Sequence, residues 1–588
     1  MTNRITTALF ALASVLCAQE AQEPVTRVYD LAALATRAHG YYHGESPGPV
    51  TRPFSLLGSS HANEAGRVGD SLEEESWAPG DVVVETVRAF VGEVEGIFEL
   101  EAIDGGLRVL ARMKEADQKT VARVLDQIRM AGDPAVQIDV RHLTIPDRSL
   151  DDATRAMLLA PGRIEAEQLA ALQRLDVRGG RQGGTVETAL GQWAVYRDVR
   201  ELRYVPDFDV EIAQGASVPD PVPSTIADGL KAAIRPFVLR DGRCLLRVVS
   251  SMGDRSDIRR FEMGSREVQD VLRLRNTDFG EVEQCDFRGG AVSTEMVVVP
   301  GKPAVVVLGV ETGTEVRWDL LALTVNRAPR AVTGDTFAVT PVGALVAGDA
   351  PRSLAWDSQT GELMLLPSEE GLCRFGLDEL PRRIDFRADL DGEFLVAEGS
   401  LFGGSLLLRG PAAGLRNAND RIAALERELI RPAQLEIRIA VVGNESRTAG
   451  LLAAPLTLDR KAAMAAYLRM DTVGDYDVEV AQEARIADPN HVVVTAGAFA
   501  NALLSQNLDG GYRLDLDLVV SAAPGGIQTS AARAGGVPAI QTVAVSRRIT
   551  PIRVDLVPDR PRTVELGTNP FGAGADARLV AVITVVPQ

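Results

Sequence analysis

The residues best placed to do chemistry in this sequence are two pairs of carboxylates, each pair separated by a single residue. Asp209 and Glu211 form the first pair, and Asp477 and Glu479 form the second. Side chains two apart on a β-strand share a face, so each pair could bind a hard cation or act as an acid and a base. The same spacing also arises on any strand that packs one face and exposes the other to water. A third interpretation is a contact surface that occurs in both places.

Other stretches with suitable residue types do not complete a known pattern. Residues 389–393, DLDGE, begin like a calcium loop, but the following residues do not continue it, and Asp-Gly favours a hairpin turn. His39 and His43 have a spacing that could ligate a metal on a helix, yet Gly40 argues against a helix there. The sequence contains no H-E-x-x-H helix or phosphate loop, and its one G-x-S-x-G spacing, GESPG at residues 44–48, lies in a polar Gly/Ser-rich connection and not between a strand and a helix. We therefore expect a protein that is not an enzyme, with no catalytic residues, no metal site and no cofactor.

The N-terminus predicts export. Arg4 precedes an apolar run at residues 5–17, which is followed by the polar sequence AQEAQEP. This order is typical of a secretory signal peptide, which we place at residues 1–18. A lipid anchor on Cys17 is the alternative, but the bulky Leu16 stands where such sites usually carry a small residue. The mature chain should therefore lie outside the cytoplasm, in the periplasm or in the outer membrane and cell envelope.

The mature chain would keep three cysteines, Cys244, Cys285 and Cys373. Their spacing is too wide for a C-x-x-C redox or zinc motif. Export would allow a disulfide between Cys244 and Cys285. The alternative is that these cysteines are buried as small hydrophobic residues.

The chain is acidic and has the composition of a folded protein. Its 588 residues carry a net charge of −19, and 46% of them are hydrophobic and 24% charged. Nucleic acids and anionic membrane surfaces require a basic partner, so this charge argues against both. Beyond the N-terminal run, no stretch reaches the roughly 18 uninterrupted apolar residues of a membrane helix.

One stretch of fifteen residues occurs twice. Residues 207–221, DFDVEIAQGASVPDP, return as residues 475–489, DYDVEVAQEARIADP, with nine identical positions at an offset of 268 (477 − 209). VPGKPAVVVLG at residues 299–309 and VPDRPRTVELG at residues 557–567 form a later pair at an offset of 258 (557 − 299). Internal similarity of this kind predicts a duplicated chain.

A small α/β module is predicted before each β-rich stretch. In the first, residues 97–103 and 107–111 form a hairpin around Asp104-Gly105-Gly106, and apolar residues from Val121 to Ile128 lie on one helical face. With an earlier strand and helix the order is βαββα. The second module repeats that order in a chain segment of weaker identity. The predicted domains are a signal peptide at 1–18, the two α/β modules at 24–131 and 334–430, and the two β-rich domains at 132–326 and 431–588.

The α/β module followed by AVQIDVRHL and a long β-rich unit resembles the secretin family of type II and III secretion. Residues 105–141 carry the closest match, and VPDRPRTVELG is similar to a hairpin near the end of secretin domains. The chain departs from the family in repeating the whole plan and in lacking a VPxxGxxPxxG-like segment. The resemblance implies periplasmic modules that precede a β-rich outer-membrane domain, in a protein that forms multimeric rings.

The sequence as a whole predicts an α+β protein that duplicates a small βαββα secretin-N-like module followed by a β-rich, sandwich or secretin-like domain. We expect an exported, non-enzymatic envelope scaffold or assembly component. Its partners would be itself or other envelope and secretion components, with association to the outer membrane and no nucleic acid. The alternative is a soluble periplasmic module that binds a ligand or a cation.

Overall fold

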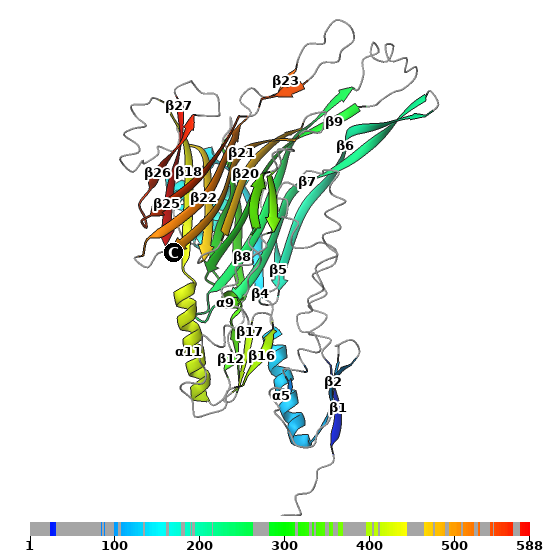
Figure 1. Cartoon of the computed structure of the whole chain (residues 1–588), viewed down its shortest axis with the longest axis vertical. Coiled ribbons are helices and arrows are strands. Elements are labelled where there is room, and N and C mark those ends of the chain that lie inside the picture. The colour runs from blue at the N-terminus through cyan, green and yellow to red at the C-terminus, as the bar shows by residue number, and fades with distance from the viewer. Residues whose placement is uncertain are drawn as a thin grey trace, which may run out of the picture.

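The structure is a computed structural model of the whole chain (Figure 1). It describes the following residues: 24–30, 84, 87–88, 99–103, 108–132, 136–159, 164–177, 183–188, 190, 194–213, 216–262, 281–311, 316–327, 332–333, 337–346, 352–356, 363–367, 395–402, 405–409, 412–443, 464–473, 477–487, 493–506, 510–522, 527–529, 541–544, 546–568 and 577–587. The predicted signal peptide and the 389–393 turn lie outside these residues, as do His39, His43 and Cys373. The described chain is rich in β-strands, as the sequence predicts.

Two small sheets, each with one long helix, lie at the end of the molecule where α5 and α11 are seen in Figure 1. The first has the order β1-β3-β2 and the second the order β12-β13-β17-β16. β1, β3 and β2 of the first sheet are matched in order by β13, β17 and β16 of the second. The bounds are β1 (Val25–Asp30), β2 (Glu99–Ile103), β3 (Arg108–Met113), α5 (Glu115–Gly132), β12 (Val332–Thr333), β13 (Phe337–Pro341), α9 (Gly343–Val346), β16 (Leu395–Phe402), β17 (Ser405–Arg409) and α11 (Ala412–Leu429).

The rest of the described chain forms two larger units of stacked sheets. In the first unit a sheet of order β10-β11-β4-β5 packs against β6 to β9, which form an antiparallel meander. Its strands are β4 (Val136–Pro146), β5 (Gly183–Thr188), β6 (Ala194–Ala213), β7 (Ala216–Val238), β8 (Cys244–Glu262), β9 (Glu281–Val298), β10 (Pro303–Glu311) and β11 (Arg317–Arg327). Between β4 and β5 the chain forms η3 (Asp147–Ser149), α6 (Asp152–Leu159) and α7 (Ala166–Leu175).

The second unit has the same strand order. Its sheet β26-β27-β18-β19 corresponds to β10-β11-β4-β5, and its meander β20-β21-β22-β25 corresponds to β6-β7-β8-β9. The bounds are β18 (Pro432–Gly443), β19 (Met464–Val473), β20 (Asp477–Ala487), β21 (Val493–Gln506), β22 (Tyr512–Ala522), β25 (Ser546–Leu556), β26 (Arg562–Thr568) and β27 (Ala577–Pro587). Two separate hairpins complete the described strands: β14 (Arg352–Trp356) with β15 (Leu363–Pro367), and β23 (Ile527–Thr529) with β24 (Gln541–Val543).

The two units share special backbone positions as well as strand order. Gly229 in β7 and Gly497 in β21 both have positive φ, 133° and 148°, at the offset of 268. The turns before β8 and β22 likewise place Gly242 and Gly510 at φ 83° and 84°. Register shifts occur at Gly309 in β10 and at Gly567 in β26, which are equivalent at the offset of 258. β7, β8 and β10 therefore have counterparts in β21, β22 and β26 that agree with the sequence offsets.

The fifteen-residue stretch itself does not follow this correspondence. Its first occurrence spans the end of the β6–β7 hairpin, where Ala213 pairs with Ala216, while most of its second occurrence is the single strand β20. The pairing partners give the structural counterpart instead: Tyr196 pairs with Ala232, and Val480 pairs with Ala500, the counterpart of Ala232. β20 thus corresponds to the first half of β6. The sequence differs at the critical place, since Gly215 of the first occurrence is a glutamate in the second.

The turn before β10 and the turn before β26 share an unusual backbone conformation, which allows the equivalence of the two units to be tested by mutation. Gly301 has φ 82° and donates its N–H to Val325, and Asp559 repeats this geometry with φ 59° and an N–H bond to Val585. Left-handed backbone strains a residue that carries a Cβ. Replacing Asp559 with glycine is therefore expected to stabilise the protein by about 0.5–1 kcal/mol in chemical denaturation.

The reciprocal change in the first turn is the matched control. Because a Cβ at Gly301 would meet no atom within 4 Å, Gly301→Asp should destabilise the protein through backbone strain alone, by about 1 kcal/mol. A loss of stability in Asp559→Gly would contradict the equivalence of the two turns.

A single hydrophobic core runs through both units. Alternate residues of β4 and β18 face alternate residues of the eight-stranded sheet, as period-two alternation requires. β22 shows the alternation clearly, because its buried residues Tyr512, Leu514, Leu516 and Leu518 all belong to this core. A second cluster covers the outer face of the first sheet with α6 and α7. A third joins the second small module to the eight-stranded sheet.

Candidate assembly edges

The structure does not bring the two predicted carboxylate pairs together. Asp209 and Glu211 lie in β6, the last strand of the eight-stranded sheet, where Asp209 is opposite Asp220 of β7. Asp477 and Glu479 lie in β20, which is an interior strand of the same sheet. The pairs therefore occupy different strand positions in the two units, and a contact surface at these residues stays a prediction.

The disulfide considered between Cys244 and Cys285 is absent. Both residues lie in the β8–β9 pair, but Cys244 is opposite Val298 whereas Cys285 is opposite Ile258. The two cysteines are therefore separated by 13 positions along the ladder (298 − 285), or about 40 Å at the usual rise of a strand. Cys244 is a free, fully buried thiol, and burial raises its pKa to about 12. Cys244 therefore fits the alternative interpretation, in which the cysteine is buried as a small hydrophobic residue.

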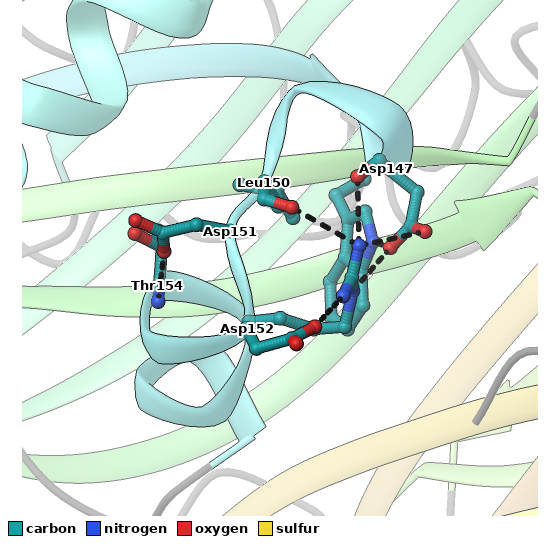
Figure 2. Close-up of polar contacts among 7 residues, drawn as sticks. Asp147, Leu150, Asp151, Asp152 and Thr154 are labelled. Carbon is teal, nitrogen blue, oxygen red and sulfur yellow. Dashed lines mark hydrogen bonds and ion pairs between the residues drawn. The ribbon is translucent and has the colours of Figure 1, made fainter. Parts of the chain in front are cut away.

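A buried arginine of α6, Arg155, organises a cluster of charged groups at the start of that helix (Figure 2). The side chain of Arg155 donates to both carboxylate oxygens of Asp147, at 2.9 and 3.1 Å, and to the carbonyls of Asp147 and Leu150. Trp318 of β11 donates its indole N–H to the same carboxylate at 3.0 Å. Hydrogen bonding to Asp147 raises the pKa of Arg155. All these groups are engaged with one another, so the cluster anchors α6 to the sheet and presents no open site.

A second polar group at one end of β4 resembles a catalytic set in composition only. His142 is buried, and its Nε2 lies 3.5 Å from Oδ1 of Asp319. Thr144 donates its hydroxyl to that same oxygen at 2.7 Å. Since Thr144 hydrogen bonds to the carboxylate and not to an imidazole nitrogen, the three residues do not form a nucleophile with its base.

Within the described ranges, no group of three or more His, Cys, Asp or Glu side chains is arranged to hold a metal ion. The helices of those ranges also include none with both the length and the apolar character of a membrane span. Among the described residues, the best-defined feature is the way the two units meet.

The two units are joined edge to edge through β9 and β20. These strands pair antiparallel from Glu479 with Ser293 to Arg485 with Phe287, and they merge the two meanders into one eight-stranded sheet. The sheets that pack on the eight-stranded sheet also meet at this junction, because β19 of the second unit lies beside β9 and β10 of the first. The junction thus joins the last meander strand of one unit to the first meander strand of the next.

The two outer edges of the eight-stranded sheet carry the counterparts of these joined strands. The sheet ends at β6, the counterpart of β20, and at β25, the counterpart of β9. A strand at the end of a sheet presents backbone N–H and C=O groups that can pair with another strand. Each chain therefore has one edge strand that corresponds to β20 and one that corresponds to β9, the two strands that pair at the internal junction.

The internal junction also gives the register in which two such edges would meet. Gln482 of β20 pairs with Gly290 of β9. Their counterparts are Asp198 of β6 and Arg548 of β25. In each case the residues that they pair with on the neighbouring strand are equivalent at the offset of 268. In this register a carboxylate lies directly opposite a guanidinium, a favourable cross-strand pair.

The same register covers apolar side chains that the single chain exposes. Val195 on β6 is 40% exposed and Ile549 on β25 is 55% exposed, and both are among the large hydrophobic residues with high exposure. Ile549 would lie opposite Arg197, and Val195 opposite Pro551, so all four side chains share one face. Pro551 lacks an N–H, a feature tolerated on edge strands. Neither exposed residue was identifiable from the sequence, because edge position depends on strand order.

Three solved secretins give a sense of the similarity to known structures. The secretin-domain β-barrel of InvG from Salmonella matches with a TM-score of 0.19 and 12% identity, over 44% of this chain and 88% of that chain. The PilQ secretin of the V. cholerae type IV competence pilus gives 0.19 and 10%, over 55% and 80%. The type II secretin GspD of E. coli K12 gives 0.21 and 9%, over 96% and 90%. No protein-family model and no curated protein sequence matches the chain. TM-scores near 0.2 are too low to assign this chain to the secretins.

Proposed function

We propose that this protein is an exported, non-enzymatic envelope scaffold that assembles head to tail with copies of itself. The observation that carries the proposal is the β9–β20 junction, whose two strand types recur at the free ends of the same sheet. β25 of one chain would pair with β6 of the next in the register that β9 and β20 use. The two β-rich domains, residues 132–326 and 431–588, would then alternate along the assembly.

A head-to-tail contact pairs one edge of each chain and leaves the other edge of each chain available for a further contact. Each added chain occupies one edge and presents another of the same kind, so growth ends only when the rotation per chain closes a ring. A ring would pair all of the β6 and β25 edges and leave no sheet end open to unrelated strands. This geometry favours a closed multimer, which agrees with the secretin-like plan expected from the sequence.

The remaining features fit a structural component better than a catalyst. The buried charged cluster of Figure 2 is internally satisfied, and the carboxylates of β20 lie in the strand that forms the internal junction. The N-terminal signal sequence would direct the chain to the periplasm or outer membrane. Other envelope or secretion components are the further partners that we propose.

The molar mass of the signal-less protein, measured by light scattering across a range of concentrations, tests the proposal. We expect a discrete species many times the 62.9 kDa of the chain, and recovery of the native protein with the cell envelope on fractionation. A monomer at all concentrations would contradict self-assembly and would favour a soluble periplasmic binding module.

A further inference from the structure

The second small module is fixed to the first β-rich unit by an apolar contact. Phe237 and Leu239 of β7 and its turn pack with Ile422 and Ile430 of the α11 segment in one buried cluster. This cluster also contains the following residues: Leu245, Val297, Val342, Ala344, Leu345, Leu408, Leu415 and Ala418. α11 therefore connects its own small sheet to the turn between β7 and β8.

Glu426 is the acidic residue buried in this contact. It lies on the same helical face as Ile422, one turn further on, and only 5% of its surface is exposed. Its Oε2 accepts the backbone N–H of Arg240 at 2.8 Å, which fixes α11 to the β7–β8 turn. Its Oε1 is buried and accepts no hydrogen bond within the part of the chain that the structure describes. Burying an ionised carboxylate is costly when one of its oxygens lacks a hydrogen bond. Burying the protonated carboxyl group costs less, because it carries no charge.

The charges around Glu426 only partly offset its burial. Burial raises the pKa of Glu426 to about 7, and the Arg240 N–H and guanidinium oppose that rise without cancelling it. Burial also lowers the pKa of Arg240, so the contact disfavours both charges. The other charged groups near the contact are Asp241 and Arg243 of the turn, Asp420 of α11, and Arg235, Arg247 and Glu295 on the sheet face around Phe237.

We propose that Glu426 acts as a proton-sensitive latch, which fastens α11 and its small sheet to the β7–β8 turn when protonated and loosens them when ionised. The proposal concerns one contact within the chain and does not depend on assembly. When the contact opens, Glu426 enters water and recovers its ordinary affinity for protons. The closed contact therefore binds more protons than the open one, and its stability falls as pH rises through about 7.

Hydrogen exchange of the amides in α11 and the β7–β8 turn measures this opening. After correction for the intrinsic pH dependence of exchange, we expect protection in the native chain to fall about tenfold between pH 6 and pH 8. Glu426→Gln, which carries an uncharged side chain of the same shape, should keep its protection nearly constant over that range.

Two further variants separate a latch from a general effect of pH. Glu428→Gln removes an exposed carboxylate from the same helix and should reproduce the native profile. Arg240→Met keeps the backbone donor but removes the cation that favours ionised Glu426, so its profile should move to higher pH. Circular dichroism establishes that each variant is folded. A flat profile in the native chain, or the native profile retained in Glu426→Gln, would overturn the proposal.

Discussion

Replacing Arg548 with glutamate is expected to reduce the large assembled species to single chains at micromolar concentration. In the register of the β9–β20 junction, Arg548 of one chain would lie opposite Asp198 of the next, so the variant would place two carboxylates face to face. Like charges across an interface cost several kcal/mol, and about 2.7 kcal/mol corresponds to a hundredfold loss of association. Light scattering of the purified variant would measure the loss.

Two controls check this result: a double variant that exchanges the two charges, and a variant at another arginine of β25. Asp198→Arg alone should disrupt assembly in the same way, and the double variant Asp198→Arg with Arg548→Glu should restore it. Arg553→Glu changes another exposed arginine of β25, which pairs with Asp515 inside its own sheet and lies beyond the junction register. That variant should assemble normally. Failure of the double variant to recover, with both single variants dissociated, would contradict the register.

Removing the carboxylate of Asp147 is expected to destabilise the first β-rich unit by about 3 kcal/mol. Asp147→Ala would leave the buried guanidinium of Arg155 without its bidentate partner and the indole N–H of Trp318 without an acceptor. Truncating the main partner of a buried charge costs more than the pair contributes, because the charge stays buried with fewer groups to offset it. Arg155 would keep only the exposed Asp152 and two backbone carbonyls as acceptors. Native-state hydrogen exchange of amides in α6 and β11 reports the change as a free energy.

The same cluster contains its own control. Asp152 also accepts a hydrogen bond from Arg155, at 2.8 Å, but its side chain is 97% exposed. Water and salt screen an exposed pair, so Asp152→Ala should change the stability little. Equal effects of the two substitutions would show that the Arg155 cluster is not the anchor of α6.

Local pattern in the sequence was sufficient for individual elements. The alternation in residues 512–518 predicts a half-buried strand, and β22 has that burial pattern. The apolar spacing from Val121 predicts a helix that the structure places at Glu115–Gly132. A helix is also predicted around residues 164–175, and the structure places α7 at Ala166–Leu175. These successes rest on interactions between residues close in the chain, which periodicity records directly.

Long-range pairing is what the sequence could not give. The fifteen-residue stretch predicts equivalent strands at Asp209 and Asp477, but the strand pairing makes β20 the counterpart of an earlier part of β6. The cluster of Arg155, Asp147 and Trp318 includes a bond across 171 residues, for which no local spacing exists. Val195 and Ile549 read as ordinary strand residues until the strand order shows that β6 and β25 are edges.

The measurement that tests head-to-tail assembly most directly is a disulfide cross-link across the predicted contact. In the full chain carrying Asp198→Cys and Arg548→Cys, the two cysteines would be directly opposed, which sets their Cα atoms about 4.5–5.5 Å apart, within the range of a disulfide. The two positions lie at opposite edges of one sheet, so the bond can form only between chains. The control pairs Arg548→Cys with Val199→Cys, whose side chain points to the other face of β6.

Under mild oxidation we predict a ladder of covalent multimers for the Asp198→Cys and Arg548→Cys variant on a non-reducing gel, and none for the control or the native chain. A variant that remains monomeric, or a control that gives the same ladder, would contradict the proposal that chains repeat the β9–β20 junction.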